Sequence, residues 1–211
     1  MSLSVEVISD VICPWCFIGK RRLETAIAAY AAPMNVQWLP FQLNPTMPTE
    51  GISRREYRTR KFGSWERSQE LDARVIEVGR EAGIDFAFDR IARTPNTLNA
   101  HRLIWLADKN GVQDAVVEAL FRAYFTQGRD ISNHQTLSDV VVEAGLDRSK
   151  VEALLHSDQG MDAMKDAAKT PRRFRVDSVP FFIVDGTITL SGAQERNVFV
   201  EAFKQAEKIG D

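Results

Sequence analysis

The chain has 211 residues, with 27 basic and 29 acidic side chains and a formal net charge of −2. Hydrophobic residues account for 44% of it and charged residues for 27%, a composition that is typical of globular proteins and excludes a disordered or collagen-like chain. The length predicts one domain, or one domain with an insertion. The balanced charge offers no general attraction to nucleic acid, and no apolar run approaches the roughly 18 residues of a membrane-spanning helix. We therefore expect neither nucleic acid nor a membrane as a partner.

The first predicted elements are a strand, a helix and a second strand. Apolar residues alternate with polar ones over residues 3–8, as in a half-buried strand. A helix is predicted to begin at Pro14, because the first helical turn does not need the missing N–H group, and to end near Ala31, where Pro33 stops it. The second strand is predicted over residues 36–43.

A long helical block follows the second strand. Residues 44–51 are polar and contain prolines, so we expect a domain boundary there. From Ser53, which fits a capping box with Glu56, to about residue 159 the pattern is helical almost throughout. The apolar stripes at helical spacing comprise Leu71, Val75 and Val78, then Leu98, Leu103, Ile104, Trp105 and Leu106, then Val116, Ala119, Leu120, Ala123 and Tyr124, and finally Val140, Val141, Val142, Val151, Leu154 and Leu155. We interpret these stripes as a helical core rather than a cofactor site.

Strand character returns near the carboxyl end of the chain. Residues 179–184 form a short apolar run, Asp185 and Gly186 fit a type I′ hairpin turn, and residues 187–190 supply the return strand. One apolar face from about Val198 predicts a final amphipathic helix. The order of the elements predicts an α/β fold with an inserted helical domain.

The chain has two cysteines, Cys13 and Cys16, with only Pro14 and Trp15 between them. Two cysteines scattered at random over such a chain would lie this close in roughly one case in a hundred, so the spacing indicates chemistry. Residues 1–10 have no signal-peptide pattern, and we therefore expect a cytoplasmic protein.

The position of the pair at the start of a helix favours redox chemistry. The helix dipole favours the thiolate form of Cys13, which makes this residue the attacking group. Cys16 lies one turn further on the same face, where it can attack a mixed disulfide formed at Cys13. Pro14 stiffens the loop, and Trp15 offers an apolar surface on which a substrate could rest.

Three other roles for the two cysteines compete with redox chemistry. A structural disulfide is disfavoured, because so short a loop removes little entropy from the unfolded chain. A zinc site is disfavoured, because there is no second cysteine pair and because His101, His134 and His156 lack the usual short spacing. Two inert cysteines are the third alternative. We expect no metal and no tightly bound cofactor.

Pro180 is predicted to open the strand that follows it, since a proline within a central strand would lose a ladder hydrogen bond. A cis Val179–Pro180 bond would turn the Val179 backbone toward an extended peptide held at Cys13. An ordinary trans proline is the alternative, because most X–Pro bonds are trans.

These features together resemble the thioredoxin fold of the DsbA family and, more narrowly, its FrnE-like branch. The motif Cys-Pro-Trp-Cys at 13–16 follows a strand, and Val-Pro-Phe-Phe at 179–182 opens a hairpin. The segments at 41–45, 96–97, 100–102 and 191–194 are also similar to recurring segments of that branch.

The resemblance implies that Cys13 is the nucleophile, Cys16 the resolving thiol and Pro180 a cis-proline facing them. It also implies a thioredoxin-like domain formed by residues 1–45 and 160–211, with an inserted all-α helical domain over residues 46–159. The predicted substrate-binding residues are Pro14, Trp15, Phe41, Asn96, His101, Val179 and Pro180. Where the family often has glycines before the Val-Pro pair, this chain has Arg175 and Ser178.

We therefore predict a thiol-disulfide oxidoreductase, a monomer or homodimer, that acts on protein, peptide or small-molecule thiols and disulfides. The alternative is a glutathione-dependent enzyme of the 2-hydroxychromene-2-carboxylate isomerase or kappa-transferase type, with glutathione as a co-substrate. Such enzymes typically have a serine where this chain has Cys13, and they do not need Cys16. A third possibility is a peptide-holding chaperone module, in which Trp15 and Phe41 contact apolar peptide.

Charged and titratable residues outside the cysteine pair have simpler default interpretations. His101 is expected to be a satisfied, partly buried histidine, with a place in a pocket wall opposite Cys13 as the alternative. Arg172, Arg173 and Arg175 are interpreted as a solvated loop rather than as a source of positive potential for the thiolate. A second basic run, interpreted as a solvated helix face, comprises Arg54, Arg55, Arg58, Arg60 and Lys61.

Overall fold

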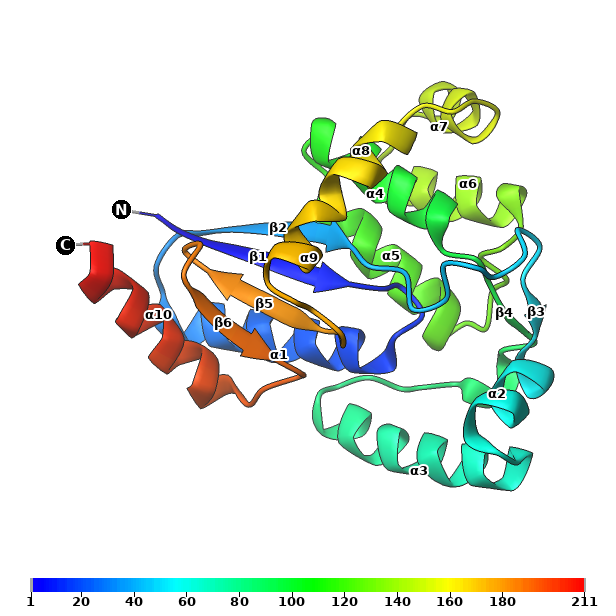
Figure 1. The fold of residues 1–211 in the computed structure, drawn as a ribbon, viewed down its shortest axis with the longest axis horizontal. Coiled ribbons are helices and arrows are strands. Elements are labelled where there is room, and N and C mark those ends of the chain that lie inside the picture. The colour runs from blue at the N-terminus through cyan, green and yellow to red at the C-terminus, as the bar shows by residue number, and fades with distance from the viewer. Residues whose placement is uncertain (1, 211) are drawn as a thin grey trace.

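The computed structural model describes residues 2–210, so Met1 and Asp211, the outer ends of the predicted thioredoxin-like domain, lie outside the described residues. A four-stranded mixed sheet with the order β2-β1-β5-β6 lies at the centre of one half of the molecule (Figure 1). The strands are β1 (Leu3–Ser9), β2 (Met34–Pro40), β5 (Phe181–Val184) and β6 (Ile188–Ser191). β1 pairs parallel with β2 and antiparallel with β5, and β5 and β6 form an antiparallel hairpin.

Helix α1 (Pro14–Tyr30) connects the two parallel strands, as a parallel pair requires a crossover connection. The predicted start at Pro14 is confirmed. The helix ends at Tyr30, because Ala31 adopts the left-handed conformation with φ 57°. α1 packs against α10 (Arg196–Gly210), which also contacts β1, β5 and β6.

The second strand ends earlier than the sequence analysis predicted. It was expected over residues 36–43, but the strand pairing with β1 ends where Ser9 faces Pro40. The amide of Phe41 still donates to Ser9 O over 3.0 Å, and the amide of Leu43 donates to the carboxylate of Asp10 over 2.8 Å. A side chain therefore replaces the β-ladder as the partner of Leu43, and the segment lies close to the turn that leads to Cys13.

Most of the helices between the two parts of the sheet pack against one another and against β2, whereas α2 and α3 pair with each other at the lower right of Figure 1, where α3 contacts α1. The helices are α2 (Arg54–Phe62), α3 (Trp65–Glu81), the short 3₁₀ helix η1 (Phe88–Arg90), α4 (Leu98–Lys109), α5 (Gln113–Phe125), α6 (His134–Glu143), α7 (Arg148–Leu155), α8 (Met161–Ala167) and α9 (Lys169–Arg173). α4, α5 and α8 contact β2. The helical block that the sequence predicted is therefore present and closes one edge of the sheet.

An aromatic cluster joins this helical block to α1. The ring of Phe17 stacks on Phe121 of α5 with centroids 5.0 Å apart, and meets Phe86 edge-on at 6.1 Å. Phe17 and Phe121 are fully buried. Because Phe17 directly follows Cys16 in the first turns of α1, this packing fixes the helix that carries the cysteine pair relative to the helical block.

The predicted helical block contains one short β-ribbon that the sequence analysis missed. β3 (Ile52–Ser53) pairs antiparallel with β4 (Arg93–Thr94). The predicted capping box is wrong: Ser53 is the N-cap of α2 but makes no side-chain capping bond, and Arg54 N instead donates to Ala92 O over 2.9 Å. Pairing with Ala92 thus satisfies the first amide of the helix, whereas a capping serine would accept from the second or third amide.

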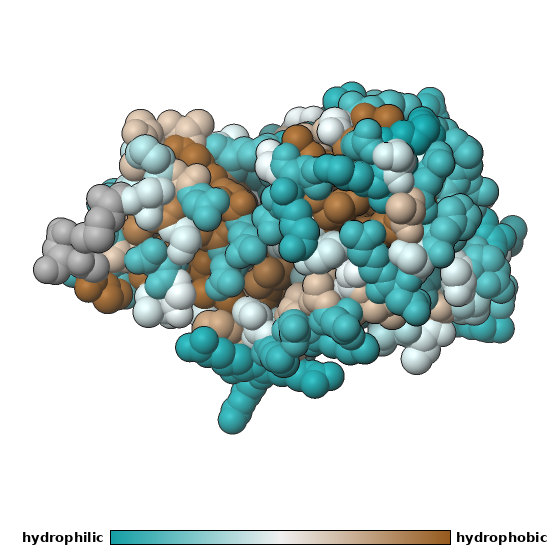
Figure 2. Space-filling view, turned by 90° about the horizontal axis from the view of Figure 1, so that it is seen from above, coloured by the Kyte–Doolittle hydropathy of each residue, from teal (hydrophilic) through white to brown (hydrophobic). Residues whose placement is uncertain are grey.

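The hairpin agrees with its sequence signal. Asp185 and Gly186 have positive φ values of 51° and 70°, and Thr187 N donates to Val184 O over 3.2 Å, as in a type I′ turn. The view from above shows apolar surface in hollows between polar side chains (Figure 2). Within residues 2–210, no helix combines the length and the apolar character needed to cross a membrane.

Candidate active site

Cys13 lies at the junction of β1 and α1, where a short turn joins them. It is the N-cap residue of α1, with Pro14 at the first helical position. Its amide donates to Asp10 O over 3.0 Å, and its carbonyl oxygen accepts from Cys16 N over 3.0 Å. The Cys13 side chain therefore lies at the positive end of the helix dipole, which favours a negative charge on its sulfur.

The two cysteines are free thiols with different surroundings. Cys13 is 5% exposed, whereas Cys16 is fully buried at 0%. Burial raises the pKa of the Cys16 thiol well above its usual value, and the hydrogen bond and negative charge of Cys13 raise it further. The Ser9 hydroxyl and the Asp10 backbone lower this pKa, but they are smaller effects. Cys16 therefore keeps its proton at neutral pH.

The loop before β5 packs directly against the cysteine pair. The Cys13 thiol donates to the backbone oxygen of Val179 over 3.4 Å, and the Val179–Pro180 bond, for which both isomers were open from sequence, is cis. Pro180 is buried against Gly19 of α1. A Cβ atom at Gly19 would lie 3.0 Å from Pro180 Cγ and 3.1 Å from Phe182 Cζ, so α1 approaches the loop this closely because position 19 is a glycine.

A cavity of about 440 Å³ opens onto Cys13. Pro14 and Trp15, two of the residues predicted to bind substrate, line it, and Trp15 is 41% exposed. The sequence analysis did not identify the other walls, which come from α2, α3 and α5 and include Arg54, Tyr57, Phe62, Leu71, Tyr124 and Phe125. Their apolar or basic character was visible in the sequence, but nothing in it related them to Cys13.

The cavity beside Cys13 carries net positive charge. Four basic residues and one acidic residue, Asp72, line it. Asp72 accepts from buried Arg54 over 2.7 Å and also pairs with Arg58, and burial lowers the pKa of the Arg58 guanidinium. The interpretation of this basic run as a solvated helix face is therefore wrong for Arg54 and Arg58, which face inward, and holds for exposed Arg55 and Arg60.

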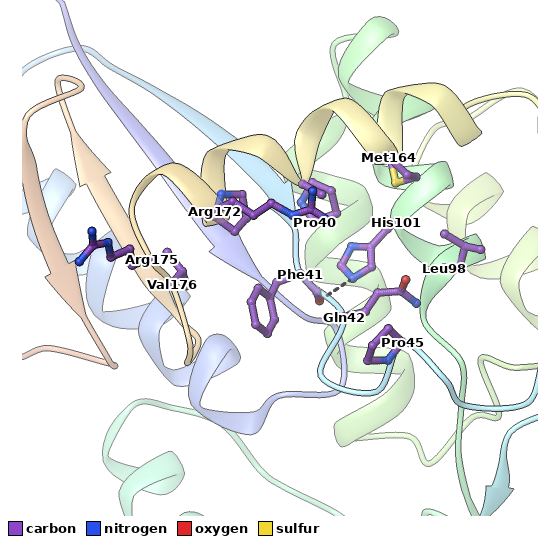
Figure 3. Close-up of a pocket in the computed structure, with 12 residues that line it drawn as sticks. Pro40, Phe41, Gln42, Pro45, Leu98, His101, Met164, Arg172, Arg175 and Val176 are labelled. Carbon is purple, nitrogen blue, oxygen red and sulfur yellow. Dashed lines mark hydrogen bonds between the residues drawn. The ribbon is translucent and has the colours of Figure 1, made fainter.

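Five of the predicted substrate-binding residues do not line the Cys13 cavity: Phe41, Asn96, His101, Val179 and Pro180. His101 is buried, and its Nε2 lies 3.1 Å from Phe41 O, so Nε2 carries the hydrogen because a carbonyl oxygen can only accept. Asn96 holds a loop in place, donating to Met47 O over 2.6 Å and accepting from Leu98 N over 2.9 Å. Phe41 and His101 instead line a second cavity, on the other side of the segment that follows β2 (Figure 3).

The described residues favour an anion over a metal ion as a ligand. Across residues 2–210, His, Cys, Asp and Glu side chains form no group of three or more that could hold a metal ion. The Cys13 cavity, with its positive charges and aromatic walls, suits an anionic co-substrate that carries an apolar group.

Comparisons with known proteins agree with this geometry. The model of the DSBA-like thioredoxin domain matches residues 4–204. The crystal structure of a probable DsbA oxidoreductase from Streptomyces coelicolor is 30% identical, with a TM-score of 0.91 over 98% of this chain and 90% of that chain. The uncharacterized protein YwbO of Bacillus subtilis (strain 168) is 25% identical over 209 residues, 99% of each chain. A 2-hydroxychromene-2-carboxylate isomerase shares the fold, with a TM-score of 0.73 at 14% identity over 98% of this chain and 97% of that chain. Because the family model spans nearly the whole chain, the protein belongs to the DsbA-like thioredoxin family.

Proposed function

We propose that this protein is a thiol-disulfide oxidoreductase in which Cys13 is the nucleophile and Cys16 the resolving thiol. The observation that carries the proposal is the difference between the two sulfurs. Cys13 lies at a helix N-terminus and lines a cavity, whereas Cys16 is fully buried and its pKa is raised. Sequential attack and resolution require one sulfur that a substrate can reach and a second, protonated sulfur that reacts only after the mixed disulfide has formed.

The reaction balances in two exchange steps. The Cys13 thiolate attacks one sulfur of a substrate disulfide, which forms a mixed disulfide and releases the other substrate sulfur as a thiolate. Cys16 then loses its proton and attacks Cys13 Sγ, so that the first substrate sulfur also leaves as a thiolate and a Cys13–Cys16 disulfide forms. Two electrons pass from the protein to the substrate. The reverse sequence oxidises a substrate dithiol.

Single cysteine variants test this division of roles. In a disulfide-exchange assay with insulin as the model substrate, Cys13→Ser is expected to abolish the reaction. Cys16→Ser is expected to form a mixed disulfide with substrate that does not resolve and that intact-mass measurement detects. Exchange that persists in Cys13→Ser, or trapping through Cys16 instead of Cys13, would overturn the proposal.

A second candidate is a glutathione-dependent isomerase or transferase, and the positively charged cavity beside Cys13 favours it. An anionic thiol such as glutathione would place its carboxylates near Lys61 and Arg74, which line this cavity. Cys16 has no part in such a reaction. Conversion of 2-hydroxychromene-2-carboxylate that needs glutathione and survives Cys16→Ala would support this candidate over the redox cycle.

A further inference from the structure

The second cavity, which lies outside the Cys13 site, has a volume of about 320 Å³ and mostly apolar walls. Figure 3 shows that its residues come from three segments distant in sequence: the end of β2 and the following loop, the start of α4, and the α8–α9 region with the loop after it. Phe41, Leu98, Met164 and Val176 supply apolar surface.

This cavity and the Cys13 cavity lie on two sides of one short segment. Phe41 and Gln42 line the second cavity, while Leu43 lines the cavity at Cys13. On the opposite wall, Val176 lies three positions before Val179, whose backbone oxygen accepts from the Cys13 thiol. An extended chain advances about 3.3 Å per residue, so a peptide whose cysteine reacts at Cys13 reaches the second cavity within a few residues.

The charged side chains that line the second cavity are basic. Arg172 and Arg175 line it, and no acidic residue does so within the described part of the chain. Arg175 has a positive φ of 53°, a conformation that glycine adopts more readily than arginine. Arg175 is exposed, and Figure 3 shows its guanidinium group directed away from Phe41 and His101, so this group lies at the rim of the cavity rather than inside it.

The backbone of Val179 explains why a polypeptide is the occupant. Its oxygen accepts from the Cys13 thiol in the free protein. When the Cys13 sulfur enters a mixed disulfide it no longer carries a hydrogen, and this oxygen becomes available to a backbone N–H group of the substrate. Such pairing orients an extended chain, and adjacent pockets then select its side chains.

We propose that the second cavity is a substrate-recognition subsite: it receives an apolar side chain near the reacting cysteine of an extended polypeptide, and Arg172 and Arg175 pair with an acidic residue beside that side chain. The inference rests on the proposed thiol-disulfide function and specifies its substrate class. A small disulfide can react at Cys13 without entering this cavity, which allows the two proposals to be tested apart.

The test uses peptide disulfide dimers in which leucine and glutamate, or leucine and lysine, flank the cysteine on both sides. Rates of single-turnover reduction by the reduced protein are divided by the same variant's rate with neutral 2-hydroxyethyl disulfide, which corrects for changes at Cys13. We expect the glutamate peptide to react at least about fivefold faster than the lysine peptide, the effect of one or two exposed ion pairs. The double variant R172E/R175E should reverse this preference.

Two further variants keep the outcome unambiguous. Arg173→Glu is the matched charge control, because Arg173 does not line the cavity and its guanidinium lies 5.3 Å from the Phe174 ring centroid; it should retain the preference. Arg175→Gly removes one guanidinium while relieving the backbone, and should reduce the preference without loss of folding. Equal rates for both peptides, or an equal effect of R173E, would overturn the subsite. Inactivity toward every disulfide, the small one included, would instead overturn the proposed function.

Discussion

The Cys13 thiol lies 3.4 Å from the backbone oxygen of Val179, although 166 positions separate the two residues. The central position of β1 produces this proximity, because β1 pairs with both β2 and β5. The turn that follows β1 carries Cys13, and the loop that precedes β5 carries Val179. Antiparallel pairing brings these two connections to the same end of the sheet.

Trp15 is expected to contribute to substrate binding rather than to stability. Its side chain is 41% exposed and lines the Cys13 cavity. Trp15→Ala should raise KM for a protein disulfide about five- to tenfold, the usual effect of removing an aromatic anchor, while the urea midpoint stays unchanged. Ile209→Ala is the matched control, since Ile209 is 60% exposed on α10 and lines neither cavity. Equal KM values for the two variants would contradict this role.

The buried thiol of Cys16 should make the stability of the reduced protein fall at alkaline pH. Burial raises its pKa in the folded state, whereas in the unfolded chain the thiol ionises near pH 8.5. Below that pH the thiol is protonated in both the folded and the unfolded state, and its contribution to the free energy of unfolding is fully present. Above it only the unfolded chain loses the proton, so the free energy of unfolding falls by up to about 1.4 kcal/mol per pH unit.

Urea denaturation of the reduced protein at several pH values from neutral to alkaline checks this dependence. Cys16→Ala is the reference, because it removes the titrating group while the other groups titrate as before. Its stability should fall less steeply with pH than that of the parent protein. Parallel curves for the two proteins would contradict the raised pKa of Cys16.

The carboxylate of Asp72 is expected to be essential for the stability of the α2–α3 pair. It accepts from buried Arg54 over 2.7 Å and also pairs with Arg58. Asp72→Asn leaves two guanidinium groups with little solvent access and no counter-charge, and should lower the free energy of unfolding by about 3–5 kcal/mol. Glu70→Gln, which removes an exposed ion pair with Arg67 on the same helix, should change it by less than about 1 kcal/mol. Similar losses in both variants would exclude a special role for Asp72.

Gly19 is expected to keep the cis-proline loop close to α1. In an open helix, Gly→Ala stabilises by about 1 kcal/mol. Here the added Cβ would lie 3.0 Å from Pro180 Cγ and 3.1 Å from Phe182 Cζ, and such overpacking typically costs about 1–3 kcal/mol. Gly19→Ala should therefore lower the free energy of unfolding and slow exchange at Cys13, as denaturation and insulin reduction would measure. A stabilised, fully active variant would show that the loop yields to the extra methyl group.

Much of the local structure could be predicted from the sequence. The helical period places Cys16 one turn after Cys13, proline favours the first position of α1, and Asp185 with Gly186 specifies the hairpin turn. The end of β2 could not be predicted, because the partner of Leu43 N is the Asp10 side chain rather than a strand. The absence of the capping bond could not be predicted either, since Ser53 pairs with Arg93 of a segment that is distant in the sequence.

The sequence by itself determined the local part of the candidate site, because the two sulfurs, their spacing and the helix that orients them lie within a few consecutive residues. Tertiary structure alone decided which residues surround the cysteine pair. Arg54 looked like a member of a solvated basic run, yet it is buried against Asp72 beside the Cys13 cavity. Propensity, turn chemistry and periodicity act between near neighbours, whereas burial and pairing depend on segments that meet only when the whole chain folds.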